Sequence, residues 1–177
     1  PTGASPPSPD RRCSPDRRNR IQRTRPDTSP STATTPCDTP SIATSGTTIV
    51  DQAGGTNGIV VVADTKTVTL TDGATLDGLD VTNHGSIKVS GPATLKNDIV
   101  SNDDADQITV DDTFTLTLDG TTIHDGHIDG DGTIEVVADS TIDNTAVIDI
   151  AHITVDDGKT LNLGTVTVSG TTIVDQA

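Results

Sequence analysis

Three stretches of the chain repeat one pattern, and this repetition limits the possible folds more than any other feature of the sequence. VVVADTKTVTL (60–70), ITVDDTFTLTL (108–118) and ITVDDGKTLNL (153–163) align without gaps, and their starts are 48 and 45 residues apart. The segments between them also agree, since HGSIKVSGPATLKN (84–97) matches DGTIEVVADSTIDN (131–144). A period of this size indicates a repeat architecture, in which each unit buries its apolar side chains against its neighbours.

Each unit consists of short segments in which apolar and polar residues alternate. Examples are TVTL, SIKV, DQITV, TFTLTL, TIEVV and TVTV, which predict half-buried β-strands because successive side chains of a strand face opposite ways. Between them stand TDG, NHG, SG, LDG, DGDG and DDG, whose glycines and aspartates favour tight turns. No helical periodicity is present, so the body is predicted to be all-β.

The composition of the body favours a thin core. Phe114 is the only aromatic residue of the chain, whereas a compact globule of this size normally fills its core with large side chains. Stacked Val, Ile and Leu fit a narrow interior instead. We therefore expect a parallel β-solenoid in which each unit makes two coils of roughly 20–25 residues. The alternative is a series of small antiparallel β-sandwiches.

The chain changes character near residue 45. Residues 1–44 contain all seven arginines, nine of the ten prolines and both cysteines, and carry a net charge of +3. Residues 45–177 carry −18 and hold the repeats. The first segment is predicted to be a disordered basic tail, because it has too few apolar residues to offset the entropy of ordering. Cys13 and Cys37 form no CxxC pair and are interpreted as incidental.

Aspartates concentrate near glycines in SNDDAD (101–106), HDGHIDGDG (124–132) and VDDG (155–158). Oxygen ligands on flexible loops are what Ca²⁺ requires. Calcium is therefore the candidate cofactor. Its candidate ligands are Asp125, Asp129 and Asp131, together with Asp103, Asp104 and Asp106. The spacing follows neither an EF-hand loop nor a calcium-binding nonapeptide, and aspartate is also an ordinary turn residue, so a structural role is favoured.

No catalytic motif accompanies these aspartates. The four histidines are His84, His124, His127 and His152, and no Ser/His nucleophile setting, phosphate-binding loop or GxGxxG is present. A carbohydrate-active β-helix enzyme using paired aspartates remains an alternative function. However, the acidic pairs recur at the turns of every unit, which favours structure over a single active site. We therefore predict no catalysis.

The T-x-T strings at 65–69, 113–117 and 165–167 suggest a further function. Threonine ladders on a flat solenoid face can organise water, as in ice-binding proteins. Threonine is also the ordinary outward residue of a strand, and Asn162 interrupts the array. This remains the lowest-ranked alternative.

The segments TLTLDGTTIHDGHIDGDGTIEV, STIDNTAVI, ITVDDGKTLNL and VTVSGTTI give the body, residues 45–177, a resemblance to the tandem β-strand repeats of very large secreted bacterial surface proteins, the repetitive adhesins. The resemblance implies an extracellular or cell-surface, stalk-like or adhesive role, often alongside calcium, with a surface ligand or glycan and neighbouring repeats as partners. It implies no active site. Neither nucleic acid binding nor membrane insertion is expected, because the body is acidic and no apolar run reaches about 18 residues.

The nonamer SGTTIVDQA occurs twice, at 45–53 and 169–177. The two copies are 124 residues apart, which is not a whole number of 45–48-residue units. We interpret the nonamer as the seam of a larger super-repeat within which the smaller units are nested.

Overall fold

The computed structural model describes residues 42–51, 57–103, 105 and 107–176, and within these residues all regular structure is β-strand. The strands lie on three faces. Face A carries β1 (Ile42–Ser45), β4 (Thr67–Thr71), β7 (Ser86–Val89), β10 (Gln107–Val110) and β17 (Thr167–Val168). Face B carries β2 (Thr48–Val50), β5 (Ala74–Asp77), β8 (Ala93–Lys96), β11 (Thr115–Asp119) and β18 (Thr172–Asp175). Face C carries β3 (Gly58–Val62), β6 (Leu79–Asn83), β9 (Ile99–Asn102), β12 (Thr122–His124), β14 (Ser140–Asp143) and β16 (Leu161–Leu163). Two longer strands, β13 (His127–Ala138) and β15 (Val147–Val155), bend from face A to face B.

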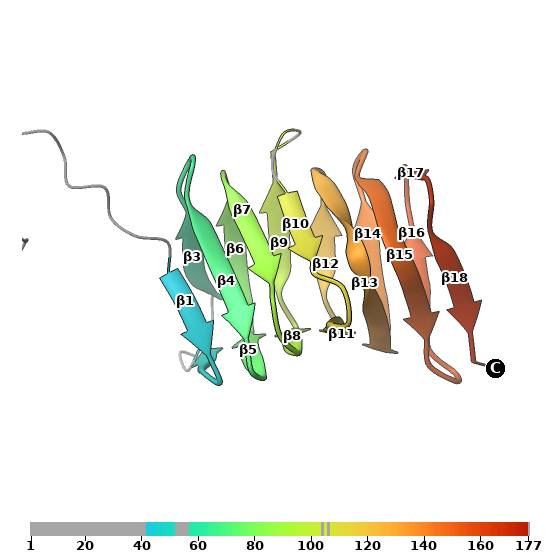
Figure 1. The fold of residues 1–177 in the computed structure, drawn as a ribbon, viewed down its shortest axis with the longest axis horizontal. Coiled ribbons are helices and arrows are strands. Elements are labelled where there is room, and N and C mark those ends of the chain that lie inside the picture. Colours follow the sequence, from blue (N-terminus) through green and yellow to red (C-terminus); the bar gives the residue numbers. More distant parts are fainter. Residues whose placement is uncertain (1–41, 52–56, 104, 106, 177) are drawn as a thin grey trace, which may run out of the picture. The chain divides into compact units, whose positions relative to one another are not determined.

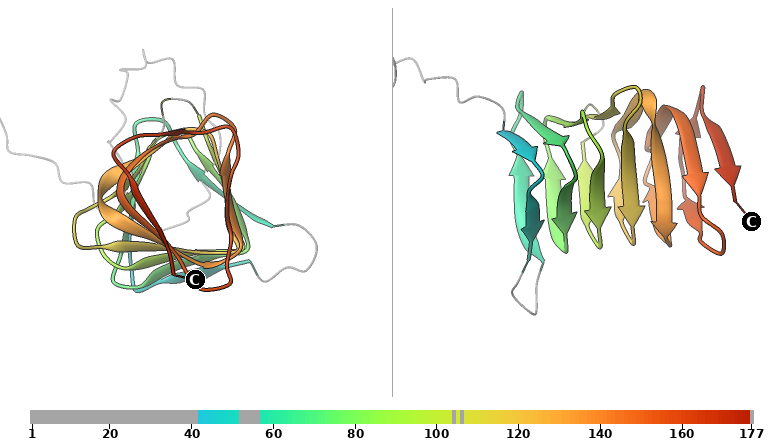
Figure 2. Two further views of the ribbon diagram at one scale, coloured as in Figure 1. Left: turned by 90° about the vertical axis from the view of Figure 1, so that its right-hand side faces the viewer. Right: turned by 60° about the horizontal axis from the view of Figure 1, so that its bottom comes forward.

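The chain winds around these three faces as a stack of coils. Figure 1 shows the stack from the side, and the left view of Figure 2 shows its three-sided outline along the axis. Every strand pairing among the described residues is parallel and joins one coil to the next. The prediction of a parallel β-solenoid is confirmed, and the alternative of antiparallel sandwiches is wrong, because a sandwich would need antiparallel pairs.

The strand register fixes the length of a coil. On face A one register position is occupied in turn by Val68, Ile87, Ile108, Ile128, Ile148 and Val168. Successive members are 19 to 21 residues apart, at the short end of the predicted range. Coils stack about 4.8 Å apart, the ordinary spacing of paired strands.

The interior is a set of aliphatic columns. Burial alternates along the strands, as in β11, where Leu116 and Leu118 point inward and are fully buried while Thr115 and Thr117 point outward. Each buried Leu or Ile contributes roughly 1.5–3 kcal/mol relative to an exposed one. The lone aromatic residue, Phe114, is only half-buried beside this core. Alternation and β-branched residues therefore suffice to fill the solenoid.

One expectation about the repeat is wrong. The 45–48-residue unit is not two coils, because its three copies fall on different faces. VVVADTKTVTL runs from β3 on face C to β4 on face A, ITVDDTFTLTL from β10 to β11, and ITVDDGKTLNL from β15 to β16. Each unit therefore covers two coils and one further face. The sequence pattern encodes a strand, a corner and a strand, and all three corners of the solenoid accept it.

The corners of these copies share one backbone conformation. Thr65 and Thr113 have φ of 63° and 69°, and the aligned residue of the third copy, Gly158, has φ of 67°. A left-handed conformation is unfavourable for β-branched residues and free of strain for glycine. The alignment therefore pairs two strained corners with one relaxed corner.

Gly130 is the residue that lets β13 turn from face A to face B without a loop. Its φ is 114°, and a Cβ atom there would lie 2.1 Å from the carbonyl oxygen of Val110 in the preceding coil. No other residue fits this position. The two glycines of HIDGDGTI thus act in a strand bend, where the sequence pattern had predicted a turn.

The two copies of SGTTIVDQA lie on the same face, six coils apart. The first forms β2 and the second forms β18, both on face B. Their registers differ by two residues. Ile49 pairs with Leu76, in the inward column that continues through Leu95, Leu118, Val136 and Val155, whereas Asp175 occupies this column in the second copy. Ile173 lies in the neighbouring inward column, opposite Ile153.

The described part of the solenoid already includes Ile42, three residues before the predicted boundary at Ser45, because β1 pairs with β4 over its whole length. Thr44 is buried opposite Leu70. The predicted basic tail otherwise lies outside the described residues.

Candidate functional sites on the solenoid surface

The candidate calcium residues of the 124–132 segment lie at three different places. Asp125 is at the corner between β12 and β13 and accepts a hydrogen bond from the hydroxyl of Thr145 at 3.2 Å. Asp129 is on face A, where its carboxylate accepts a hydrogen bond from Gln107. Asp131 is exposed in the bend of β13. Asp125 lies in a corner with φ of 58°, before the strand that carries Asp129, and among the described side chains these residues form no group of three metal ligands.

The other candidates do not form a metal cage within the described part of the chain. Asp103 is paired with His84, whose Nδ1 lies 2.8 Å from its carboxylate, while Asp104 and Asp106 lie outside the described residues. Where side chains are described, no three His, Cys, Asp or Glu residues gather as metal ligands. Calcium binding at 101–106 stays a prediction.

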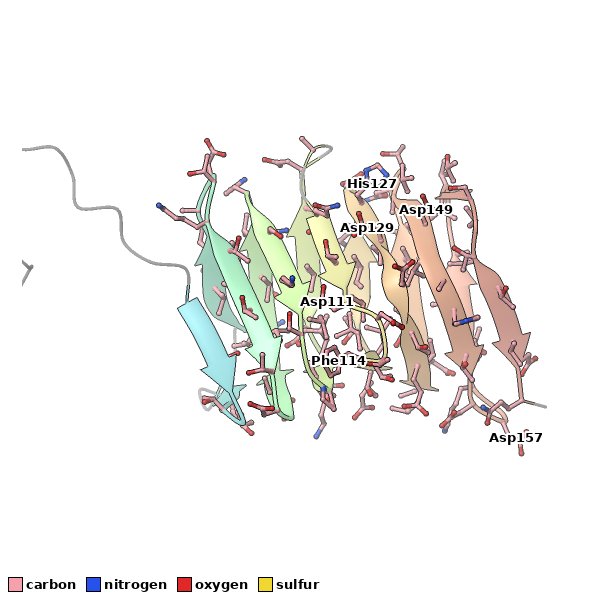
Figure 3. All side chains as sticks on the ribbon, in the orientation of Figure 1. Asp111, Phe114, His127, Asp129, Asp149 and Asp157 are labelled. Atoms are coloured by element: carbon pink, nitrogen blue, oxygen red, sulfur yellow. The ribbon has the colours of Figure 1, made fainter. Side chains whose placement is uncertain are left out.

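On face A, acidic side chains from neighbouring coils lie close together. Asp129 and Asp149 are register partners, and Figure 3 shows them side by side across β13 and β15. One carboxylate oxygen of Asp129 is buried without a hydrogen-bond partner. In the coil before Asp129, Asp111 accepts a hydrogen bond from the Ser90 hydroxyl at 2.7 Å and forms an ion pair with Lys88 at 3.1 Å. The Ser90 hydrogen bond, aided by Lys88, lowers the pKa of Asp111, so this carboxylate is a charged structural group rather than a proton donor.

Two of the four histidines, His84 and His124, form pairs with aspartate. His124 hydrogen-bonds through Nδ1 to Asp143 of the next coil, with the Asn144 amide at 3.2 Å from the same nitrogen. Ser101 is the register partner of His124 on its other side. His127 begins β13 on face A, beyond the corner that follows His124.

This column, formed by Ser101, His124 and Asp143, resembles a Ser-His-Asp catalytic triad in residue type only. None of the hydrogen bonds among the described residues joins Ser101 to His124. The backbone N–H groups of these strands are engaged in the ladders between coils, so they offer no oxyanion hole. The column supports packing between coils more than acyl transfer.

A polar ladder inside the corner between faces B and C was not found from the sequence. Asp98, Thr121 and Ser140 occupy one register position and are all buried. The Asp98 carboxylate accepts hydrogen bonds from the backbone N–H groups of Leu79 at 2.8 Å and Lys96 at 3.0 Å. Burial raises its pKa from 3.8 to about 6 despite these hydrogen bonds. Asp98 is 1% exposed, so it is a structural group out of reach of substrate.

A second interior ladder lines the corner between faces C and A. The buried Asn83 donates to the side-chain oxygen of Asn102 at 3.0 Å, and Asn102 donates to the carbonyl oxygens of His124 and Asp125. These bonds satisfy polar groups where the chain leaves one sheet for the next.

The predicted T-x-T strings do not form one ladder. The string at 113–117 lies on face B, whereas those at 65–69 and 165–167 reach face A five coils apart, with non-threonine residues in the register positions between Thr67 and Thr167. A threonine ladder does form on face B, and Thr117 is the one member that a predicted string contains. Thr48, Thr75, Thr94 and Thr117 are successive register partners on the outside of face B, followed by Glu135 and Thr154. Their spacings in the sequence are unequal, so only the coil length reveals the column.

The described surface shows recesses at the two ends of the stack. One, of about 80 Å³ and entirely apolar, is lined by Ile49, Val60, Val62 and Val68 among others. The other, of about 330 Å³, lies at the last coil beside Val155, Leu161, Leu163 and Ile173. Neither gathers several carboxylates, as a hydrolase cleft would.

The fold places the chain in the class of parallel β-solenoids. Comparison with known protein families, with curated proteins and with solved structures finds no match. Where the chain is described, it contains no helix long and apolar enough to cross a membrane.

Proposed function

We propose that residues 42–176 are a structural segment of an extracellular repeat protein, a rigid spacer that presents or carries an adhesive surface and performs no catalysis. The observation that carries this proposal is the distribution of the carboxylates. Aspartates stand at corners on every side of the solenoid, as Asp64, Asp112, Asp131 and Asp157 illustrate. Such a distribution keeps a long array soluble, whereas an enzyme would concentrate acidic groups in one concavity.

Two further features support a mechanical role. Parallel ladders run along all three faces of the described solenoid, with register shifts only in the pairings of β13, and the nonamer recurs after six coils on the same face. The super-repeat returns the chain to the same face, with a register difference of two residues, so copies can follow one another along one stack. Extension by one super-repeat adds about 29 Å of length at constant cross-section.

The test is to duplicate residues 45–168 within the full chain and to measure both proteins by small-angle X-ray scattering. We expect the longest dimension of the folded part to increase by about 29 Å and the cross-sectional radius to stay the same. Insertion of residues 45–163 instead, which ends on face C and is not a whole number of coils, is the matched control for added mass. A duplicate that folds as a separate body beside the first would refute the spacer function.

The threonine column of face B favours a second candidate, organisation of water at an ice surface. Thr48, Thr75, Thr94 and Thr117 repeat at the coil spacing and form no side-chain hydrogen bonds among the described residues. Thermal hysteresis of the full chain tests it. Loss of hysteresis in Thr94→Lys, but not in Thr109→Lys on face A, is the expected result, and absence of hysteresis in the wild type would refute it.

A further inference from the structure

Two neighbouring coils place carboxylates side by side on the outside of face A. Asp129 of β13 and Asp149 of β15 are register partners, and Figure 3 shows their side chains next to each other. Paired strands lie about 4.8 Å apart, so the two carboxylates come close together. Like charges directly opposite each other destabilise a sheet. The ladder of face A therefore contains a repulsive pair that a bound cation would compensate.

The contacts of Asp129 hold one of its carboxylate oxygens and leave the other without a partner. Oδ2 accepts a hydrogen bond from the side-chain amide of Gln107 in the preceding coil. Oδ1 is buried and has no hydrogen-bond partner among the described residues. A buried oxygen is costly unless some group satisfies it, and a bound water or ion is the usual explanation in a native structure. The second carboxylate beside this oxygen favours a cation over a water molecule.

Asp149 contributes a carboxylate that no side chain neutralises. Its Oδ1 lies close to Gly170 of the next coil, where a Cβ atom would be 2.6 Å from this oxygen. Within the part of the chain that the structure describes, the Asp149 side chain makes no hydrogen bond or ion pair. Lys88 is the one lysine on the described strands of face A, and it is already paired with Asp111 at 3.1 Å. The pair of carboxylates thus has no lysine or arginine of its own on this face.

We propose that Asp129 and Asp149 bind one hard divalent cation, Ca²⁺ or Mg²⁺, which bridges β13 and β15. Carboxylate oxygens suit both ions, at about 2.3–2.6 Å from Ca²⁺ and about 2.0–2.1 Å from Mg²⁺. These distances fit a cation held between two strands about 4.8 Å apart, with water completing its shell. The sequence grouped Asp129 with Asp125 and Asp131, whereas the coil register groups it with Asp149.

The bridge lies beside an irregular point of the ladder. The pairing of β13 with β15 has a register shift between Gly130 and Thr133, which follows Asp129 directly. A cation held by both strands at this point fixes the two coils to each other where the regular pairing is interrupted. This role is a brace between coils, and it does not depend on the proposed spacer function.

Isothermal titration calorimetry of the full chain with CaCl₂ or MgCl₂, at constant ionic strength, tests the site. We expect saturable binding of at least one of the two ions. Asp129→Asn and Asp149→Asn should each weaken this binding roughly tenfold or more, because each removes one of two charged ligands. Asp157→Asn removes the same charge at an exposed corner and should bind as the wild type does. The same response to NaCl would show charge screening alone and would overturn the proposal.

A second variant, Asp149→Lys, supplies a cation from the chain itself. In chelator we expect it to melt at a higher temperature than the wild type, because a lysine opposite Asp129 replaces repulsion by attraction. The divalent ion should raise the melting temperature of the wild type more than that of Asp149→Lys, with circular dichroism confirming that both fold. Equal shifts in the wild type, Asp149→Asn and Asp149→Lys would assign the ion to another part of the chain, such as 101–106, and would refute a site at Asp129 and Asp149.

Discussion

The buried carboxyl group of Asp98 should make the stability of the solenoid fall as the pH rises through the weakly acidic range. Its pKa is raised from 3.8 to about 6, chiefly by burial, although two backbone N–H groups donate to it. The folded protein therefore keeps a proton that the unfolded chain has already released. For an acid whose pKa is raised by folding, the unfolding free energy is greatest below the unfolded pKa and declines up to the folded pKa.

The expected size of the effect follows from the two pKa values. Each unit of pKa difference corresponds to about 1.4 kcal/mol, so the rise from 3.8 to about 6 corresponds to about 3 kcal/mol between pH 3.5 and pH 7. Asp98 is 1% exposed, so solvent screens little of this energy. A loss of this size is a large fraction of the stability of an ordinary domain.

Urea unfolding followed by circular dichroism, at several pH values, measures the effect against the Asp98→Asn variant. The amide stays neutral, so the wild type should lose about 3 kcal/mol relative to Asp98→Asn as the pH rises from 3.5 to 7. The absolute stability of the variant reflects its altered hydrogen bonds and does not enter this comparison. Asp157→Asn, at an exposed corner, controls for the loss of one carboxylate. A constant difference between wild type and Asp98→Asn across the pH range would refute the assignment of a buried, proton-retaining carboxyl.

Four other expectations follow. Thr113→Gly should raise the unfolding free energy by up to about 1 kcal/mol and Gly158→Thr should lower it, because both positions have positive φ; opposite shifts of the urea midpoint are the test. Gly130→Ala should lower the unfolding free energy by about 3 kcal/mol or more, since its Cβ would lie 2.1 Å from the Val110 carbonyl oxygen. Gly158→Ala, whose Cβ would have nothing within 4 Å, should lower it by about 1 kcal/mol. Similar melting temperatures of the two variants would contradict the role of Gly130 in the bend. Asn102→Ala should cost about 1–3 kcal/mol by leaving buried polar groups unpaired, and Asn162→Ala, on the surface, should change little in the same urea assay. If the aspartates of 101–106 bind calcium, calcium should raise the melting temperature relative to chelator. Identical transitions in calcium and in chelator would contradict calcium binding.

The fold was accessible from the sequence because local rules decide most of it. Alternation in strings such as TFTLTL predicts strands that bury one side, and β11 shows this pattern residue by residue. The single aromatic residue excludes a thick core, which leaves stacked coils. The order of the faces was not accessible, because the repeated unit describes a corner and its flanking strands. Three similar corners accept the same unit, so sequence similarity does not report which face a strand joins.

The candidate sites were harder to predict for the same reason. Asp98, Thr121 and Ser140 meet only because the coil length brings them into one register position, and nothing in their local sequences marks them as buried. The threonine column of face B has the same origin. In contrast, the aspartates of segment 124–132 are close in sequence but separated in the structure, because strand β13 extends most of this segment across face A. Nearness in a solenoid depends on the coil period more than on the distance along the chain.

The two repeat lengths therefore have different consequences for binding. A unit of 45–48 residues advances the chain by two coils and one face, so equivalent outward residues of successive units point in different directions. Such a repeat cannot build a row of identical sites along one face. The 124-residue spacing of the nonamer corresponds to six coils and returns the chain to face B. If the array continues with this super-repeat, identical ligand sites can recur on one face only about every 29 Å. A multivalent partner should therefore have binding groups about 29 Å apart, and a partner with more closely spaced groups should bind at a single site.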